Sequence, residues 1–209
     1  MLLIQIGAAA IVVSYYQFSG MEAFCSRLAE IKTNGGLLFS GTVGAFAGGI
    51  VPEIAKLATG QKFERGRWKD ILLVCAYFAW MGVTVDIMYA WFGRLYGADH
   101  AVLTILKKNA TDMGVFCPFV AVPTSVLAFT WMDMRFNGAA TKAAWRNGGF
   151  WDRYIKILLP NWMVWIPVLF AVYALPVNLQ FLMAELAEAA WSILVVSISR
   201  AEVSTAEGP

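Results

Sequence analysis

The sequence predicts an all-α, polytopic transmembrane helix bundle with about four to six membrane helices and short amphipathic surface helices. Hydrophobic residues make up 59% of the chain and charged residues 14%, which is too little polar material to cover a soluble surface. Apolar runs of near-bilayer length alternate with short polar loops. Nine Trp, seven Tyr and fourteen Phe suit the headgroup level of a bilayer. We therefore expect one integral membrane domain over residues 1–209.

The apolar runs can be placed in order along this domain. The first has no charged residue and forms an extra N-terminal segment within residues 1–20; whether it spans the membrane or is re-entrant stays open. The expected membrane segments are residues 2–18, 35–58, 71–92, 113–132, 161–176 and 177–198.

Amphipathic stretches between these runs predict short helices on the membrane surface. They cover residues 21–32, 99–109 and 150–159. In the second, we expect Lys107 and Lys108 to face headgroups. The span that follows contains Pro118 and Pro123, which should kink it and free backbone carbonyls that neighbouring helices must satisfy.

Small residues recur every fourth position in residues 35–58, including Gly41, Gly44, Gly48 and Gly49. This spacing gives a smooth helix face that allows close backbone approach in lipid. Two partners for the face are considered: a neighbouring helix of the same chain, or a second copy of the chain in a homo-oligomer.

Acidic residues within apolar runs are the main functional signal, since ionisable groups at membrane depth usually face a bundle interior or a hydrated cavity. They are Asp86, Glu185 and Glu188. The two glutamates share a helical stripe with Asn178 and Ser192. The spans that hold these acids contain no Lys or Arg, so the acids are either protonated or in contact with water. Alternatively, the last helix lies shallower and its acids reach headgroups or a loop lysine such as Lys156.

The sequence gives little support to metal-binding, catalytic or nucleic-acid-binding sites. With three widely spaced cysteines and one histidine, the sequence predicts no metal site, no catalytic pair and no cofactor, and we do not expect an enzyme. The small net charge of +2 does not suggest a nucleic-acid partner.

Three motifs carry a family resemblance. The first runs from Gly82 to Tyr89 and is followed by Arg94; the second is the segment 106–118, with its Lys-Lys and Asp112; the third is the segment 159–165, followed by Pro176 and Trp191. Together, over residues 33–198, they resemble the family of Mpv-seventeen and the twenty-two-kilodalton peroxisomal membrane protein. The resemblance implies an organelle membrane, with the mitochondrial inner membrane first and the peroxisomal membrane second, and a weakly selective channel.

Two functions follow as expectations. In the first, the protein is a channel for small solutes or ions: Asp86, Glu185 and Glu188 face a hydrated interior, and Lys107, Lys108 and Asp112 lie at its mouth. In the second, it is a non-transporting accessory subunit of a larger membrane complex, such as a respiratory complex.

Overall fold

The computed structural model describes residues 2–60 and 67–206, and every regular element within them is helical. This confirms the predicted fold class. The helices in chain order are α1 Leu2–Gln17, α2 Ser19–Gly44, η1 Ala45–Ile50, α3 Val51–Ala58, α4 Trp68–Tyr96, α5 Val102–Thr111, η2 Asp112–Ala121, α6 Val122–Asp133, α7 Gly138–Trp145, η3 Arg146–Gly148, α8 Gly149–Tyr173 and α9 Val177–Ala206.

Four helical stretches in the described residues are long and apolar enough to cross a membrane: Ser19–Ala58, Trp68–Tyr96, Val102–Asp133 and Gly149–Tyr173. Large apolar side chains face outward along them; Phe119 is 74% and Leu72 62% exposed. Water would not tolerate such a surface, whereas lipid favours it. The chain is therefore an integral membrane protein. α1 is a shorter apolar helix, and α9, whose apolar run is interrupted by two glutamates, is not one of the four candidates.

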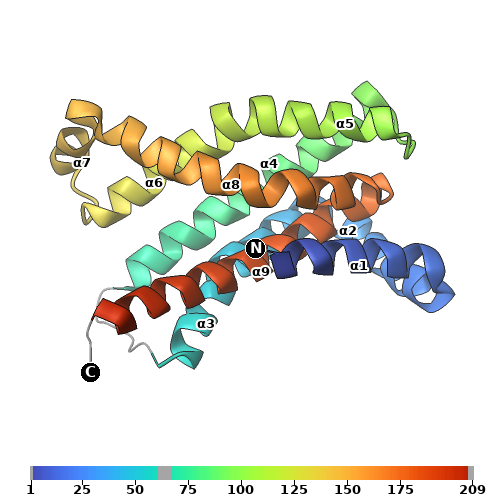
Figure 1. Ribbon diagram of the computed structural model, residues 1–209, viewed down its shortest axis with the longest axis horizontal. Helices are drawn as coiled ribbons and strands as arrows, with labels where there is room; N and C mark the ends of the chain where they lie inside the picture. The colour runs from blue at the N-terminus through green and yellow to red at the C-terminus, as the bar shows by residue number, and fades with distance from the viewer. Residues whose placement is uncertain (1, 61–66, 207–209) are drawn as a thin grey trace.

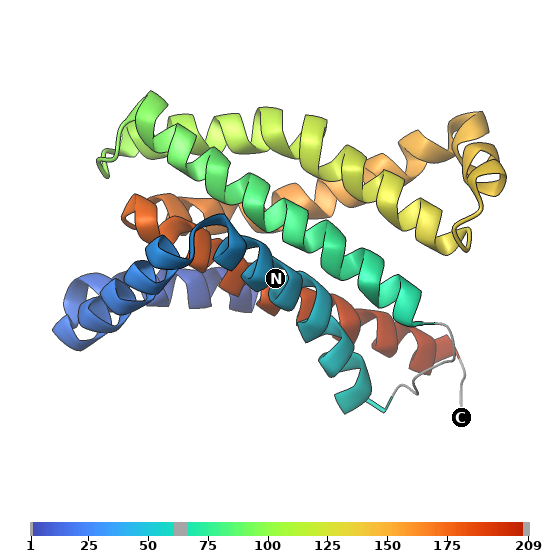
Figure 2. The same ribbon diagram turned by 180° about the vertical axis from the view of Figure 1, so that it is seen from behind.

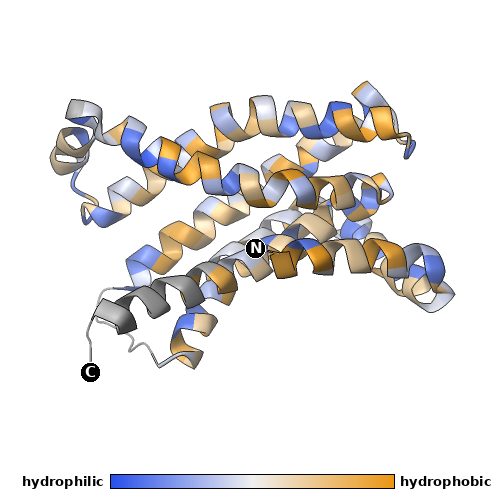
Figure 3. Cartoon of the chain, in the orientation of Figure 1, coloured by the Kyte–Doolittle hydropathy of each residue, from blue (hydrophilic) through white to orange (hydrophobic). Residues whose placement is uncertain are grey.

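The helices pack in two groups that α4 crosses (Figures 1 and 2). One group contains α5, α6, α7 and α8, and the other contains α1, α2, α3 and α9. α9 contacts α2, α3, α4 and α8, so it joins the groups. The buried core includes Phe92 of α4, Val126 of α6, and Val172 and Tyr173 of α8. Apolar residues dominate the long helices, with hydrophilic positions scattered among them (Figure 3).

The predicted short surface helix over residues 99–109 is wrong as a separate element, and the amphipathic stretch 150–159 is continuous with the helix that follows it. Residues 99–109 lead into α5, which continues through η2 and α6 to Asp133, and residues 150–159 form the first part of α8. The polar side of α5 is covered by protein instead of headgroups: Thr104, Lys108 and Asn109 are all buried. The third stretch, residues 21–32, opens α2, which breaks at Gly36 with a φ of 53°.

The small-residue face packs against α4 of the same chain. A Cβ atom on Gly44 would lie 2.4 Å from the Phe78 carbonyl oxygen, and one on Gly49 would lie 2.7 Å from Cys75 Sγ. Gly48 faces the Phe78 ring, while Gly41 is looser, with Val83 at 3.4 Å. Side chains at these tight positions would push the two helices apart, so the glycines set their separation.

In the third span, Val102–Asp133, side chains of a neighbouring helix bond to the backbone carbonyls that the prolines leave without a donor. η2 is a π-helix, in which a carbonyl bonds to the N–H five residues later. For Met113 and Pro118, that fifth residue is Pro118 and Pro123, respectively, and proline has no N–H. Trp162 Nε1 donates to the Met113 carbonyl at 2.8 Å, and the Tyr154 hydroxyl donates to the Pro118 carbonyl at 2.9 Å. Side chains of α8 thus satisfy the carbonyls that the prolines free.

α1 is attached in a similar way. Pro167 in α8 frees the carbonyl of Met163, four residues earlier, and Gln5 Nε2 of α1 donates to this oxygen at 3.1 Å. Nearer the end of α8, the Tyr16 hydroxyl donates to the Ala174 carbonyl at 2.7 Å. The N-terminal segment therefore belongs to the bundle, packed along α8.

Candidate functional site

A cavity of about 410 Å³ lies between α4, η2, α6, α8 and α9. Its polar lining includes the carboxyl groups of Asp112, Glu185 and Glu188, together with Asn161 and Ser125. None of the lining residues is Lys, Arg or His. Helices from three of the four candidate spans thus enclose an acidic cavity that has no basic group in its wall.

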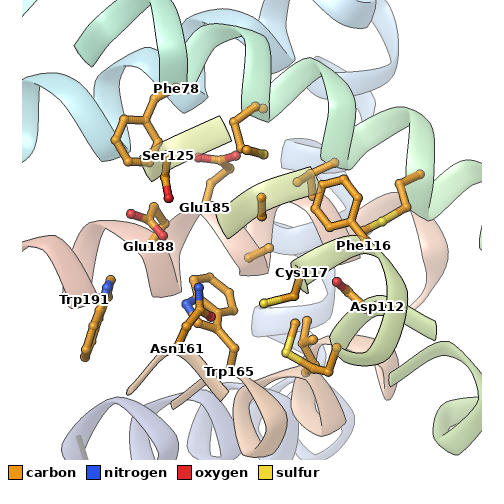
Figure 4. A pocket seen from close by; sticks show the side chains of 18 of the residues that line it. Phe78, Asp112, Phe116, Cys117, Ser125, Asn161, Trp165, Glu185, Glu188 and Trp191 are labelled. Carbon is orange, nitrogen blue, oxygen red and sulfur yellow. The ribbon is translucent and has the colours of Figure 1, made fainter. Parts of the chain in front are cut away.

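Glu185 and Glu188 project from one side of α9 because they are three residues apart. Glu185 is 8% exposed and makes no hydrogen bond or ion pair in the described part of the chain. Glu188 accepts a hydrogen bond from the Ser192 hydroxyl at 3.3 Å. Gly82 of α4 lies next to Glu185: a Cβ atom on Gly82 would lie 2.6 Å from the Ser40 carbonyl oxygen of α2 and 3.4 Å from Glu185 Oε1. In Figure 4 both carboxylates face the open space from α9.

Asp112 enters the same cavity from the start of η2, and it is held firmly. The Tyr173 hydroxyl donates to its Oδ2 at 2.5 Å, and the Tyr173 ring meets the Tyr89 ring edge-on with centroids 5.4 Å apart. Asp112 and Tyr173 are 3% and 0% exposed. Asp112 therefore has a fixed partner, whereas Glu185 has none among the described residues.

Asp86 does not line this cavity. It lies at a second one, of about 440 Å³, together with Lys32, His100 and Asn178. Lys32 Nζ lies 2.5 Å from Asp86 Oδ1, and the Ser40 hydroxyl donates to Oδ2 at 2.6 Å. The predicted polar stripe is thus split: Glu185 and Glu188 face the first cavity, whereas Asn178 faces the second.

The expectation that Asp86 lacks a buried partner fails because its partner comes from outside the spans that were searched. Lys32 lies in the amphipathic stretch 21–32, which packs beside α4 as part of α2. The loop lysine suggested for the glutamates pairs elsewhere: Lys156 Nζ contacts Asp152 at 2.7 Å.

The three expected mouth residues occupy different environments. Lys107 is exposed, but Lys108 is 1% exposed, with its ammonium group 6.0 Å from the centroid of the Tyr173 ring. The orientation predicted for Lys108, toward headgroups, is wrong because α5 packs that side against α8. Asp112 lies inside the cavity wall.

Sequence reasoning missed the aromatic part of the wall. Phe78, Phe116, Trp165 and Trp191 all line the cavity, and Figure 4 shows them around the acidic groups. Aromatic residues in apolar runs suggested interfacial anchors, and their periodicity alone does not separate a ring at the headgroups from a ring in an internal wall. The described residues contain no group of His, Cys, Asp and Glu arranged to hold a metal ion.

Comparison with known proteins identified no relative of this chain. No family model matches the chain, and neither a curated protein nor a solved structure matches it. The resemblance to the Mpv-seventeen family stays a prediction from the motifs, and the chain is described by what its structure shows: an integral membrane protein with four candidate spans and an acidic internal cavity.

Proposed function

We propose that the protein is a weakly selective channel that conducts small cations through the cavity lined by Asp112, Glu185 and Glu188. The single observation behind this proposal is the composition of that lining: three carboxyl groups and no basic side chain, enclosed by membrane helices. Carboxylates at membrane depth stabilise cations and repel anions.

The unpaired state of Glu185 supports the same function. A buried carboxylate without a partner is costly, and structural carboxylates usually have their partner in place, as Asp86 does with Lys32. A passing cation would supply the missing partner for Glu185.

For the localisation of the protein, we propose the mitochondrial inner membrane first and the peroxisomal membrane second, following the family resemblance. The proposal involves no catalytic step. Fractionation of cells that express the tagged chain, with inner-membrane and peroxisomal markers, tests this localisation.

The test of the channel is planar-bilayer conductance of the purified protein beside Glu185→Gln/Glu188→Gln. We expect wild-type conductance with cation preference, and a reversal potential in a salt gradient that moves toward zero in the double variant. Glu22→Gln/Glu30→Gln is the matched control, since it makes the same change at two exposed positions of α2.

A folded protein that gives no current contradicts the channel. Copurification in fixed stoichiometry with a larger membrane complex would then favour the accessory-subunit function instead. Unchanged conductance and selectivity in Glu185→Gln/Glu188→Gln would also contradict the role given to this cavity.

A further inference from the structure

The wall of the acidic cavity favours organic cations over hydrated inorganic ions. Aromatic rings and thioethers make up much of its apolar part, beside a few aliphatic residues; the aromatic and thioether residues are Tyr77, Phe78, Met81, Met88, Tyr89, Met113, Phe116, Phe129, Trp165 and Trp191. A small inorganic cation would have to bring water into this apolar space or lose its hydration there. An organic cation carries its own apolar shell and loses less on entry.

Aromatic walls also attract cations directly. The face of an aromatic ring is electron-rich, and tryptophan attracts ammonium groups most strongly. Trp165 of α8, Trp191 of α9 and Phe78 of α4 line the cavity that Glu185 and Glu188 face (Figure 4). Rings and carboxylates from three helices thus surround one space, as in sites that recognise alkylated ammonium groups.

Glu185 and Glu188 carry the negative charge available to such a ligand. Glu185 is 92% buried, since its exposed fraction is 8%, and it has no hydrogen-bond or ion-pair partner in the described residues. Its Oε1 lies beside Gly82, where a Cβ atom would come within 3.4 Å of it. Glu188 is next to it on α9 and keeps only the Ser192 hydroxyl. An ammonium group between the rings would give Glu185 the charge partner that the described residues do not provide.

We propose that this cavity is a binding site for an organic monocation: an alkylated ammonium group attached to an apolar, preferably aromatic, body. The inference rests on the proposed function in one respect, because it names the class of cation that the same cavity takes. The cavity volume of about 410 Å³ suits this ligand, since small-molecule sites commonly span roughly 300–1,000 Å³.

The test compares two probes of nearly equal shape. Phenyltrimethylammonium carries the charge, and tert-butylbenzene is its neutral carbon counterpart. Binding of each to the protein in lipid nanodiscs is measured by equilibrium dialysis, with protein-free discs of the same lipid subtracted. We expect the cation to bind about tenfold more tightly than the neutral probe, after this subtraction.

Variants locate the site. Glu185→Gln/Glu188→Gln should weaken binding of phenyltrimethylammonium by about tenfold and leave tert-butylbenzene nearly unchanged, because the substitution keeps shape and removes charge. Trp191→Leu should weaken the cation several-fold, whereas Trp68→Leu, at a position 56% exposed and outside the cavity, should not. Thermal unfolding and elution volume of each variant confirm its fold.

Equal binding of the two probes overturns the inference, as does cation binding that survives in the double glutamine variant. Failure here is distinguishable from failure of the channel. Potassium conductance without phenyltrimethylammonium binding removes this inference and leaves the pore, whereas binding without any conductance removes the pore and leaves the site.

Discussion

At the residue scale, the acidic side chains differ mainly in their partners. Asp86 has an ammonium group and a hydroxyl within 2.6 Å, Asp112 has the Tyr173 hydroxyl at 2.5 Å, and Glu185 has neither kind of partner among the described residues. A carboxylate with a complete set of partners stabilises a fold, whereas one facing a cavity is available to a ligand. The partners of Asp86 therefore favour a structural role, and the proposed channel uses the cavity glutamates.

Removing one member of the Asp86 pair should cost more than removing both. Lys32→Met leaves Asp86 buried without its charge partner and should lower stability by about 1.5–3 kcal/mol, the usual worth of a hydrogen bond to a charged group. Asp86→Asn should also destabilise the protein, and adding it to Lys32→Met should recover part of the loss. Thermal unfolding in detergent of the two single variants and the double variant measures this double-mutant cycle. Additive losses of stability would contradict a coupled pair.

At the element scale, the shape of the third span depends on side-chain donors from α8. In and just after the π-helical run η2, Pro118 and Pro123 each leave the carbonyl five residues earlier without a backbone donor. Trp162 and Tyr154 fill these two positions. Because η2 also carries Asp112 and Cys117 into the cavity wall, the same hydrogen bonds position part of the site.

Trp162→Phe keeps an aromatic ring but removes the donor to the Met113 carbonyl. We expect a loss of ~1 kcal/mol, since a buried carbonyl is left unsatisfied. Trp68→Phe is the matched control, because Trp68 is 56% exposed and its indole makes no hydrogen bond in the described residues. Chemical unfolding in mixed micelles compares the two; equal losses would show that the indole N–H of Trp162 contributes nothing.

At the scale of the whole molecule, α4 holds the bundle together through backbone contact with α2 and η1. Gly44 meets Gly82 at the closest point, where a Cβ on Gly44 would lie 3.1 Å from Gly82 Cα as well as 2.4 Å from the Phe78 carbonyl oxygen. Backbone atoms cannot move aside as a flexible side chain can. This contact positions Gly82, and with it the part of the cavity wall next to Glu185.

Gly44→Ala should separate α2 from α4 and destabilise the fold by about 1–3 kcal/mol, as overpacking of a tight interface does. The same change at Gly20, on the same helix, meets nothing within 4 Å and should be neutral or slightly stabilising, since alanine favours helix. Thermal unfolding of the two variants side by side measures the difference. A Gly44→Ala protein as stable as Gly20→Ala would contradict the close approach.

The sequence by itself determined that this protein lies in a membrane and that its regular elements are helices. Apolar runs of bilayer length require a membrane, and backbone groups within lipid must be satisfied in helices. The sequence also identified the small-residue face of 35–58, the prolines of the third span and the buried acids, because each is rare in its setting and therefore informative.

Only the tertiary structure decided which of these features meet. Glu185 and Asp112 are 73 residues apart and share a cavity, whereas Asp86 lies at a second cavity, paired with Lys32 of the stretch 21–32. Lys108 was expected at headgroups and is covered by α8. The physical reason is that periodicity fixes the side of a helix on which a residue lies, but the neighbour that covers this side depends on how separate helices pack.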